Sequence, residues 1–397
     1  MTAEECQPGR NGVSRSAISI GILAWNEEEA IGATLESLFA QTLFAKLAAN
    51  GLHCEILCVT NGCTDRTPEI VSEVCEQQQA VHPHRASFIA RACNIVQRGK
   101  NNAWNLFVHQ LSRRESDYLI LMDGDIVLQD PDTLWNMYRA LELNDEAAIA
   151  TDNPIKDVSL KSRKGFVERA SLGASAMTQS AAAQVTGQLY CIRTPIARNI
   201  YLPRDLVACE DGFIKSLVCT FSLMRESTPG RVVQAANASH VFQAYTSLRD
   251  ILRNQKRQII GQTIVHILVD KHLKQLSLDE KINLGETLQD KEQSDPHWLK
   301  RLIADHLRET RVFWRLYPNL LTSRFARLRR LRGIKKLMCL PIAIAGSAVT
   351  LLAAWLAWQF LKKGYTDYWP DTRSPGLKEF TLGEQPRGAI LGPLGTN

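Results

Sequence analysis

The sequence predicts an α/β fold in which a mainly parallel sheet is covered by helices on both faces. Short apolar runs alternate with segments of helical periodicity, which is typical of consecutive β-α-β units. The apolar runs are continuous rather than alternating, as expected of strands buried on both faces. Unusual polar clusters follow these runs at residues 26–29, 61–65 and 123–125. Because ligands bind beyond the carboxyl ends of parallel strands, we expect a binding site there.

The predicted elements follow one another in a regular order. Turns and helices lie between the predicted strands, with Asn26 as N-cap of the first helix, acidic residues in its first turn, and Pro68 near the start of the second. Strands are expected at 17–25, 54–60, 86–96, 117–122 and 146–151, and turn-helix segments at 26–42, 61–77, 99–114 and 131–143.

Composition and charge argue against several classes of protein. The chain has 397 residues, 45% of them hydrophobic and 22% charged, which is an ordinary globular composition. The net charge of +6 is too modest to indicate nucleic acid as a partner. The 10 cysteines lack paired spacing and mostly stand in apolar runs, which favours reduced core thiols in a cytosolic compartment. Segment 1–15 is polar, so we expect it to be disordered and not a signal peptide.

An uncharged segment near the C-terminus is long enough to cross a membrane. Residues 337–361 contain no charged side chain, and Lys335, Lys336, Lys362 and Lys363 bracket them. As a helix with a rise of 1.5 Å per residue, this segment would extend roughly 37 Å, more than the ~30 Å of a bilayer core. We therefore predict one transmembrane helix over 337–361, with a buried core helix as the alternative.

A basic amphipathic region precedes this segment. Residues 273–336 are helical in pattern, and arginines and lysines interleave with apolar residues over 300–336. Such helices lie on anionic membrane surfaces, although a solvated basic helix would show the same pattern. By the positive-inside rule, the domain at 16–272 is expected in the cytoplasm, because the short tail at 362–397 nearly balances its charges. No function follows from the polar segment 273–300.

Two aspartates end the strand predicted at 117–122. Asp123 and Asp125 are separated only by Gly124, and carboxylates this close repel each other unless a positive charge lies between them. They would suit a hard divalent cation, Mg²⁺ or Mn²⁺, which takes oxygen ligands and shares them with phosphates. A plain Asp-Gly turn is the alternative. We predict a metal site at this turn.

Several segments resemble, in order, the motifs of family 2 glycosyltransferases with a GT-A fold. They lie within residues 17–262 and read AWNEEEAIGATLESL, VTNGCTDRT, GKNNAWN, LMDGD, GQLYCIR followed by ACEDGFI, and RNQKRQIIG. Each motif alone is weak, but their joint order and spacing are specific. The resemblance implies transfer of a sugar from a nucleotide-sugar donor.

The resemblance also implies roles for individual side chains on the donor side. Asp125 would bind the metal directly, and Asp123 would bind the metal or the donor ribose. The other donor-side residues would be Glu27 and Asn61 in the nucleotide pocket, Asp65 ordering the adjacent loop, and Lys100 near the nucleotide or the diphosphate. A helix N-cap is an equal reading of Asp65, and a plain surface lysine is an alternative reading of Lys100.

The sequence departs from the family pattern after the second strand. The family often has two acids there, and this chain reads Thr60-Asn61. The amide of Asn61 could still pair with a base edge, because it offers both donors and an acceptor. Uridine is the base that the resemblance implies, and this departure leaves the base open.

Glu210 and Asp211 resemble the acidic pair at the start of a helix in the family. Asp211 would be the general base that takes a proton from an acceptor hydroxyl, and Glu210 would help to tune it. Acids that merely favour the helix dipole would look the same. His240 is a further candidate metal ligand.

RNQKRQIIG differs from the QxxRW signature of membrane-associated members. Arg257 matches the arginine and would pair with the diphosphate, although a helix-surface arginine is the alternative. Asn254 replaces the glutamine, and Gln258 replaces the tryptophan. That tryptophan usually forms part of the acceptor platform of processive synthases, so its absence argues against such an enzyme.

Together these features predict an inverting, metal-dependent glycosyltransferase of the hexosyl or N-acetylhexosaminyl class. The acceptor would be a lipid, a lipid-linked molecule or a polysaccharide at the cytoplasmic face of the cell membrane. A processive polysaccharide synthase subunit and a catalytically inactive GT-A membrane scaffold are the alternatives. A nucleotidyltransferase is disfavoured, because acidic WNEEEA stands where that class has a glycine-rich phosphate loop.

Overall fold

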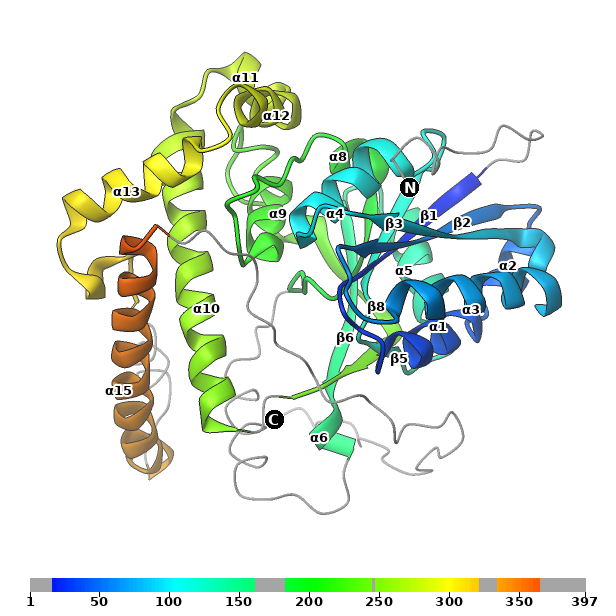
Figure 1. Ribbon diagram of the computed structural model, residues 1–397, viewed down its shortest axis with the longest axis horizontal. Helices are drawn as coiled ribbons and strands as arrows, with labels where there is room; N and C mark the ends of the chain where they lie inside the picture. The colour runs from blue at the N-terminus through cyan, green and yellow to red at the C-terminus, as the bar shows by residue number, and fades with distance from the viewer. Residues whose placement is uncertain (1–15, 161–182, 245–246, 321–333, 365–397) are drawn as a thin grey trace, which may run out of the picture.

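The computed structural model describes residues 16–160, 183–244, 247–320 and 334–364, without the side chains of residues 16, 248, 334–343 and 345 (Figure 1). A mixed sheet lies at its centre, with strands in the order β3-β2-β1-β4-β7-β6-β8-β5. The strands are β1 (Ser16–Ala24), β2 (His53–Asn61), β3 (Phe88–Ile95), β4 (Tyr118–Asp123), β5 (Val127–Leu128), β6 (Ile149–Lys156), β7 (Leu189–Arg193) and β8 (Val232–Phe242).

Helices cover both faces of the sheet, which confirms the predicted α/β class. Alternate residues of each strand face opposite sides, so Ile20 and Ile120 join one hydrophobic cluster while Leu119 and Leu121 join the other. The helices of this part are α1 (Ile31–Phe39), α2 (Leu43–Ala49), α3 (Thr67–Val81), α4 (Lys100–Leu106), α5 (Thr133–Glu142), α6 (Asp157–Leu160), α8 (Thr194–Ala197) and α9 (Glu210–Cys219). A π-helical turn, Phe107–Leu111, continues α4.

The predicted start of the first helix is wrong. Asn26 is not an N-cap but has a left-handed backbone with φ of 54°, and α1 begins only at Ile31. The side chain of Asn26 instead accepts a hydrogen bond from the backbone N–H of Thr64, at 2.8 Å. The polar residues after β1 therefore form a loop tied to the loop after β2, and this frees them to line a site.

The sheet is parallel in one half and mixed in the other. β1 pairs in parallel with β2 and β4, and β2 pairs in parallel with β3. β7 then runs antiparallel between β4 and β6, while β6 and β8 are parallel. The antiparallel pairing places Leu189 opposite Met122. As a result, residues just before β7 lie beside the aspartates that follow Met122.

Helices from the C-terminal part pack at one side of the sheet domain. They are α10 (Leu248–His266), α11 (Leu278–Ile282), α12 (Leu284–Ser294), α13 (Trp298–Thr310) and α15 (Ile334–Lys362). In Figure 1, α10 stands between α15 and the sheet domain, with α11 and α12 above it. The helical pattern predicted for 273–336 is thus found in α11, α12 and α13, and its residues 321–333 lie outside the described part.

The predicted transmembrane helix is not supported. α15 runs beside α10, and its residues Ala354, Ala357 and Leu361 are buried in the hydrophobic core (Figure 1). Among the residues that the structure describes, no helix combines the length and the apolar character needed to cross a membrane. The apolar run at 337–361 is accounted for in part by this packing, and the side chains of 337–343 lie outside the description.

A glycine lets α10 approach the start of α9 closely. A Cβ atom at Gly261 would lie 2.5 Å from the Sγ of Cys209 and 2.8 Å from the carbonyl of Ala208. Such distances are too short for any side chain. The absence of a side chain at Gly261 therefore allows α10 to lie close to the loop that precedes Glu210.

We expect Gly261→Ala to destabilise the protein by about 1–3 kcal/mol, because the added methyl group must push α10 away from a backbone carbonyl. Chemical denaturation of the purified protein measures this change. Gly32→Ala is the matched control, since Gly32 lies in α1 with no atom within 4 Å of an added Cβ. The control should be stabilised, by up to about 1 kcal/mol. Equal changes in the free energy of unfolding for the two substitutions would contradict the close approach of α10 to the loop before α9.

Candidate functional site

A pocket of about 700 Å³ lies at the carboxyl ends of β1, β2 and β4, where the sequence predicts a site. Its walls come from the loops after these strands, from the first turns of α4 and α9, and from α10. The predicted site residues that line it are Glu27, Asn61, Lys100, Asp123, Asp125, Glu210, Asp211 and Arg257. Asp65 lies outside this lining.

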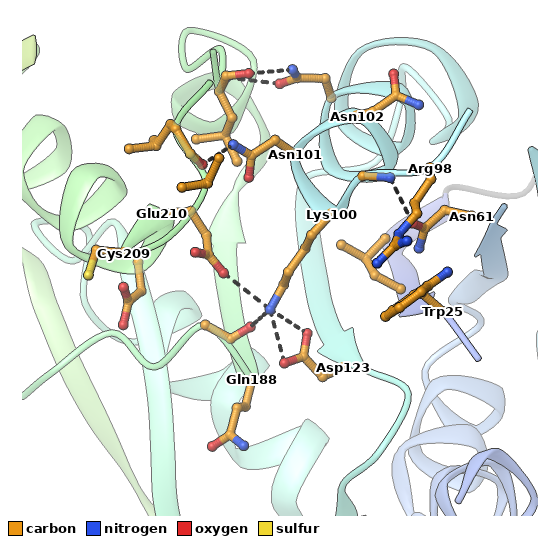
Figure 2. Close-up of a pocket in the computed structure, with 18 of the residues that line it drawn as sticks. Trp25, Asn61, Arg98, Lys100, Asn101, Asn102, Asp123, Gln188, Cys209 and Glu210 are labelled. Carbon is orange, nitrogen blue, oxygen red and sulfur yellow. Dashed lines mark hydrogen bonds and ion pairs between the residues drawn. The ribbon is translucent and has the colours of Figure 1, made fainter. Parts of the chain in front are cut away.

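Lys100 occupies the centre of the site (Figure 2). Its Nζ lies 2.7 Å and 3.0 Å from the two carboxylate oxygens of Asp123, and 3.2 Å from Oε1 of Glu210. It also donates a hydrogen bond to the carbonyl of Gly187, at 3.0 Å. One ammonium group therefore joins the end of β4, the residues before β7 and the start of α9.

The positive charge of Lys100 sets the ionisation of its neighbours. Burial acts against it, but the carboxylates of Asp123 and Glu210 raise the pKa of Lys100 above its ordinary value. Burial would raise the pKa of Glu210, and the charge of Lys100 instead holds it below its ordinary value. Burial raises the pKa of Asp123 to about 6 even though Lys100 opposes this effect. Glu210 therefore remains ionised beside the ammonium group.

Glycines provide the space that this cluster needs. A Cβ at Gly187 would lie 3.0 Å from Oε1 of Glu210, so a side chain there would compete with the ion pair. A Cβ at Gly124 would lie 2.9 Å from the Cβ of Ala24 on the neighbouring strand. The carbonyl of Gly124 accepts a hydrogen bond from the hydroxyl of Thr34, at 2.9 Å, which anchors the turn between the aspartates to α1.

Asp125 is the carboxylate better placed for a cation, because Lys100 already binds both oxygens of Asp123. Burial raises the pKa of Asp125, and the charges of Lys100 and Arg257 oppose this rise. Within the described ranges, no group of 3 or more His, Cys, Asp or Glu side chains is arranged to hold a metal by itself. A metal that shares its coordination between a carboxylate or two and substrate phosphates needs no such group.

His240 is fully buried and held in a fixed orientation. Its Nδ1 lies 2.6 Å from a carboxylate oxygen of Asp152, and its Nε2 lies 3.3 Å from Oε1 of Gln188. A carboxylate on one ring nitrogen is the arrangement that orients metal-binding histidines. Both ring nitrogens of His240 thus have protein partners, and His240 does not line the pocket, so the structure does not support the expectation that it binds the metal.

Asp211 lies in the first turn of α9, next to a strained residue. Cys209, which precedes the helix, has a left-handed backbone with φ of 62°. Its thiol donates to Oε1 of Gln258 on α10, at 3.4 Å. Burial raises the pKa of Asp211 to about 6, and the negative charge of Glu210 adds to this rise. The turn therefore holds a carboxylate that changes its charge near neutral pH.

α10 contributes the residues of the variant signature. Asn254, Arg257 and Gln258 all line the pocket. Arg257 lines the same pocket as Asp125 and Asp211, and its charge opposes the rise that burial causes in their pKa values. Arg257 therefore belongs to the site and is not a plain helix-surface arginine.

The amide of Asn61 is engaged by the backbone, not by the open pocket. Its Nδ2 donates to the carbonyl of Ala24, at 2.8 Å, and its Oδ1 accepts from the backbone N–H of Gly99, at 3.1 Å. Only 4% of the residue is exposed. Asn61 thus joins the loops that follow β1, β2 and β3. The expectation that its amide pairs with a base edge conflicts with these bonds.

Asp65 connects two loops from outside the pocket. Its carboxylate accepts hydrogen bonds from the N–H and the hydroxyl of Thr67, at 3.1 Å and 2.6 Å, and from the N–H of Glu28, at 3.1 Å. The N–H of Glu27 in turn donates to the Thr67 hydroxyl, at 2.7 Å. Asp65 therefore orders the loop that presents Glu27 to the pocket.

Several residues that line the pocket were not predicted from the sequence. Trp25 and Arg98 line the pocket, and so do Glu292 and Pro296 from the segment to which the sequence assigned no function. Trp25 directly follows β1, and an aromatic residue at a strand end was a usable signal. The other residues reach the pocket only through tertiary packing, which no local pattern shows.

We expect Lys100→Met to destabilise the protein by roughly 3 kcal/mol, because it leaves two carboxylates without their counter-charge. The estimate is at the low end for a buried pair, since the side chains of Lys100, Asp123 and Glu210 are 27%, 19% and 10% exposed. Chemical denaturation at neutral pH measures the loss.

Lys46→Met is the matched control for this prediction. Lys46 pairs with Asp132 at 2.6 Å, and their side chains are 36% and 42% exposed. Surface pairs contribute at most about 1 kcal/mol. A loss as small for Lys100→Met as for Lys46→Met would show that the central cluster does not stabilise the fold.

No curated protein matches the sequence. Among solved structures, mannosyltransferase PcManGT from Pyrobaculum calidifontis, in complex with GDP-Man and Mn²⁺, is similar over 91% of this chain and 92% of its own, with 16% identity and a TM-score of 0.49. Glucosyl-3-phosphoglycerate synthase from Mycobacterium tuberculosis, in complex with Mn²⁺, UDP and glucosyl-3-phosphoglycerate, is similar over 63% of this chain and 80% of its own, with 16% identity and a TM-score of 0.42.

The sequence profile of glycosyl transferase family 2 matches residues 19–186. This segment contains the loops after β1 and β2, Lys100, and the two aspartates at the end of β4, Asp123 and Asp125. Over residues 19–186 the chain is thus similar to the family that the motifs indicated, which confirms that expectation for this segment.

Proposed function

We propose that the chain is an inverting, metal-dependent glycosyltransferase that moves a sugar from a nucleotide-sugar to a hydroxyl of a lipid, lipid-linked or polysaccharide acceptor. The observation that carries this proposal is the cluster at Lys100, which brings the aspartates after β4 and the acids of α9 into one pocket. Similarity to glycosyl transferase family 2 over residues 19–186 supports the reaction class.

The residues at the end of β4 fit a divalent cation and a diphosphate. When bound, Mg²⁺ or Mn²⁺ would neutralise the diphosphate and stabilise it as the leaving group. Asp125 would hold the cation, with Asp123 beside it and phosphate oxygens of the donor completing its coordination. Arg257 would contact the diphosphate from α10 with a charge that does not depend on pH.

Asp211 would act as the general base. Its carboxylate accepts the proton of the acceptor hydroxyl while that oxygen forms a bond to the anomeric carbon. The bond between this carbon and the diphosphate oxygen breaks, and its electron pair leaves with the nucleoside diphosphate. The configuration at the carbon inverts, because attack and departure occur on opposite faces. A pKa of about 6 suits a base that works near neutral pH.

The transferred sugar is a hexosyl or N-acetylhexosaminyl group in this proposal. A processive synthase subunit would differ by the length of its product, which a size assay of the glycan reveals. An inactive scaffold would release no nucleoside diphosphate from any donor. The complete set of Lys100, both aspartates, Glu210 and Asp211 favours an active enzyme.

We expect Asp211→Asn to lower kcat by about 10²–10⁴-fold with little change in donor affinity, because an amide cannot accept the proton. A panel of nucleotide-sugars, assayed with divalent metal for release of the nucleoside diphosphate, measures this. Asp145→Asn is the control, since the side chain of Asp145 is fully exposed and does not line the pocket. In the unmodified protein, kcat should fall about tenfold per pH unit below pH 6, where Asp211 becomes protonated. Near wild-type turnover by Asp211→Asn would overturn the mechanism.

The outer face of α15 supports contact with a membrane surface. Ile344, Leu351, Leu352 and Trp355 are 56%, 38%, 49% and 45% exposed, while the opposite face of the helix is buried in the core. The exposed Lys362 and its neighbour Lys363 follow at the end of the helix. An apolar face next to lysines suits the surface of an anionic bilayer, with the catalytic domain in the cytoplasm. The described cysteines are free thiols, which suits that compartment.

We expect the protein to sediment with vesicles that contain anionic lipid and to bind neutral vesicles less. The double substitution Leu352→Glu and Trp355→Glu should reduce the bound fraction several-fold, because each glutamate replaces an apolar contact and repels the lipid headgroups. Val81→Glu is the control, since Val81 is 64% exposed on α3, away from α15 (Figure 1). Binding that does not respond to the α15 substitutions would refute this membrane surface.

A further inference from the structure

A stacked pair of side chains lies in the pocket on the far side of Lys100 from α9. The guanidinium carbon of Arg98 lies 3.5 Å from the centre of the Trp25 ring. Trp25 follows β1, and Arg98 lies in the loop between β3 and α4. Both residues are half-buried and line the pocket, and Figure 2 shows them together beside Asn61.

The arrangement of the sheet indicates what this pair faces. β4 lies between β7 on one side and β1, β2 and β3 on the other. Asp211 and α9 lie on the β7 side of Lys100, so the acceptor and the transferred sugar must lie there. A diphosphate at Asp125 therefore directs the nucleoside the other way, over the ends of β1 and β2. Trp25 and Arg98 stand at those ends.

Asn61 is poorly placed to select the base, because only 4% of it is exposed and both ends of its amide are bound to the backbone. Its Oδ1 is bound by the N–H of Gly99, and its Nδ2 is bound to the carbonyl of Ala24. Breaking these bonds would leave buried backbone groups without partners. Selection of the base thus passes to side chains that extend further into the pocket, and the Trp25–Arg98 pair is the one with a planar face and a set of donors.

We propose that Trp25 and Arg98 select the base of the donor and that the preferred base is guanine; this inference rests on the proposed function. Stacking on Trp25 fixes the plane of the guanidinium, and a guanidinium has five N–H donors in a rigid fork, enough to serve partners in the protein and a base edge together. O6 and N7 of guanine are adjacent acceptors that match this fork.

The other bases fit this fork less well. Uracil places its N3–H donor between its two carbonyl acceptors, so the fork meets only one acceptor at a time. Adenine offers N7 beside an amino donor, which opposes the guanidinium. Cytosine has adjacent acceptors in O2 and N3, but its single ring presents less surface for stacking. Guanine combines both features, which departs from the uridine that the family resemblance implies.

The test measures the affinities of GDP, UDP, CDP, ADP and pyrophosphate for the full-length protein with Mn²⁺, by isothermal titration calorimetry. We expect GDP to bind at least about tenfold more tightly than UDP. Arg98→Lys keeps the charge but loses the fork, so it should bring the GDP-to-UDP ratio towards unity and leave pyrophosphate affinity unchanged. Trp25→Ala should weaken every nucleotide and leave pyrophosphate unchanged, while Trp25→Phe should retain most of the affinity.

The outcomes separate this inference from the proposed function. Tighter binding of UDP, CDP or ADP than of GDP, or an unchanged ratio in Arg98→Lys, would overturn the guanine assignment alone. If pyrophosphate affinity falls with nucleotide affinity in both Arg98→Lys and Arg98→Gln, Arg98 serves the fold or the diphosphate, and the assignment is again overturned. A protein that binds neither pyrophosphate nor any nucleotide would contradict the proposed function as well.

Discussion

One ammonium group makes the architecture of the site possible. The carboxylates of Asp123 and Glu210 come from segments far apart in the sequence, and without a cation between them they would repel each other in a partly buried space. Lys100 contacts both, together with the carbonyl of Gly187. The antiparallel return of β7, the missing side chain at Gly187 and the position of α9 all serve this contact. The rest of the pocket is arranged around it.

This contact also divides the acids into two kinds. The carboxylates of Asp123 and Glu210 form ion pairs with Lys100 inside the protein. Those of Asp125 and Asp211 remain available to bind a ligand or to accept a proton. Asp211 owes its raised pKa to burial and to the ionised Glu210 beside it. Because Lys100 keeps Glu210 ionised, it acts indirectly on Asp211 as well. Arg257 reaches the same acids from α10, whose approach depends on Gly261.

Local sequence patterns predicted the features that depend on neighbouring residues in the chain, namely the strands and the polar residues at their ends. Continuous apolar runs located β1, β2 and β4, and polar residues at their ends gave one part of the pocket lining. The antiparallel direction of β7 escaped prediction, because strand direction depends on the rest of the sheet. Asn26 was misread since its partner, Thr64, lies in another loop. The length and hydropathy of the run at 337–361 predicted a transmembrane helix, because the sequence does not reveal the core against which α15 packs. The hydrogen bonds of the Asn61 amide to Ala24 and Gly99 were also not predictable, because they join loops that meet only in the folded protein.

The match to the family ends at residue 186, and the next residue is Gly187. The boundary thus passes through the cluster at Lys100: the lysine and Asp123 lie on one side of it in the sequence, and Glu210 on the other. A change at position 210, after this boundary, therefore acts on Lys100 before it, because the lysine contacts carboxylates from both parts of the chain.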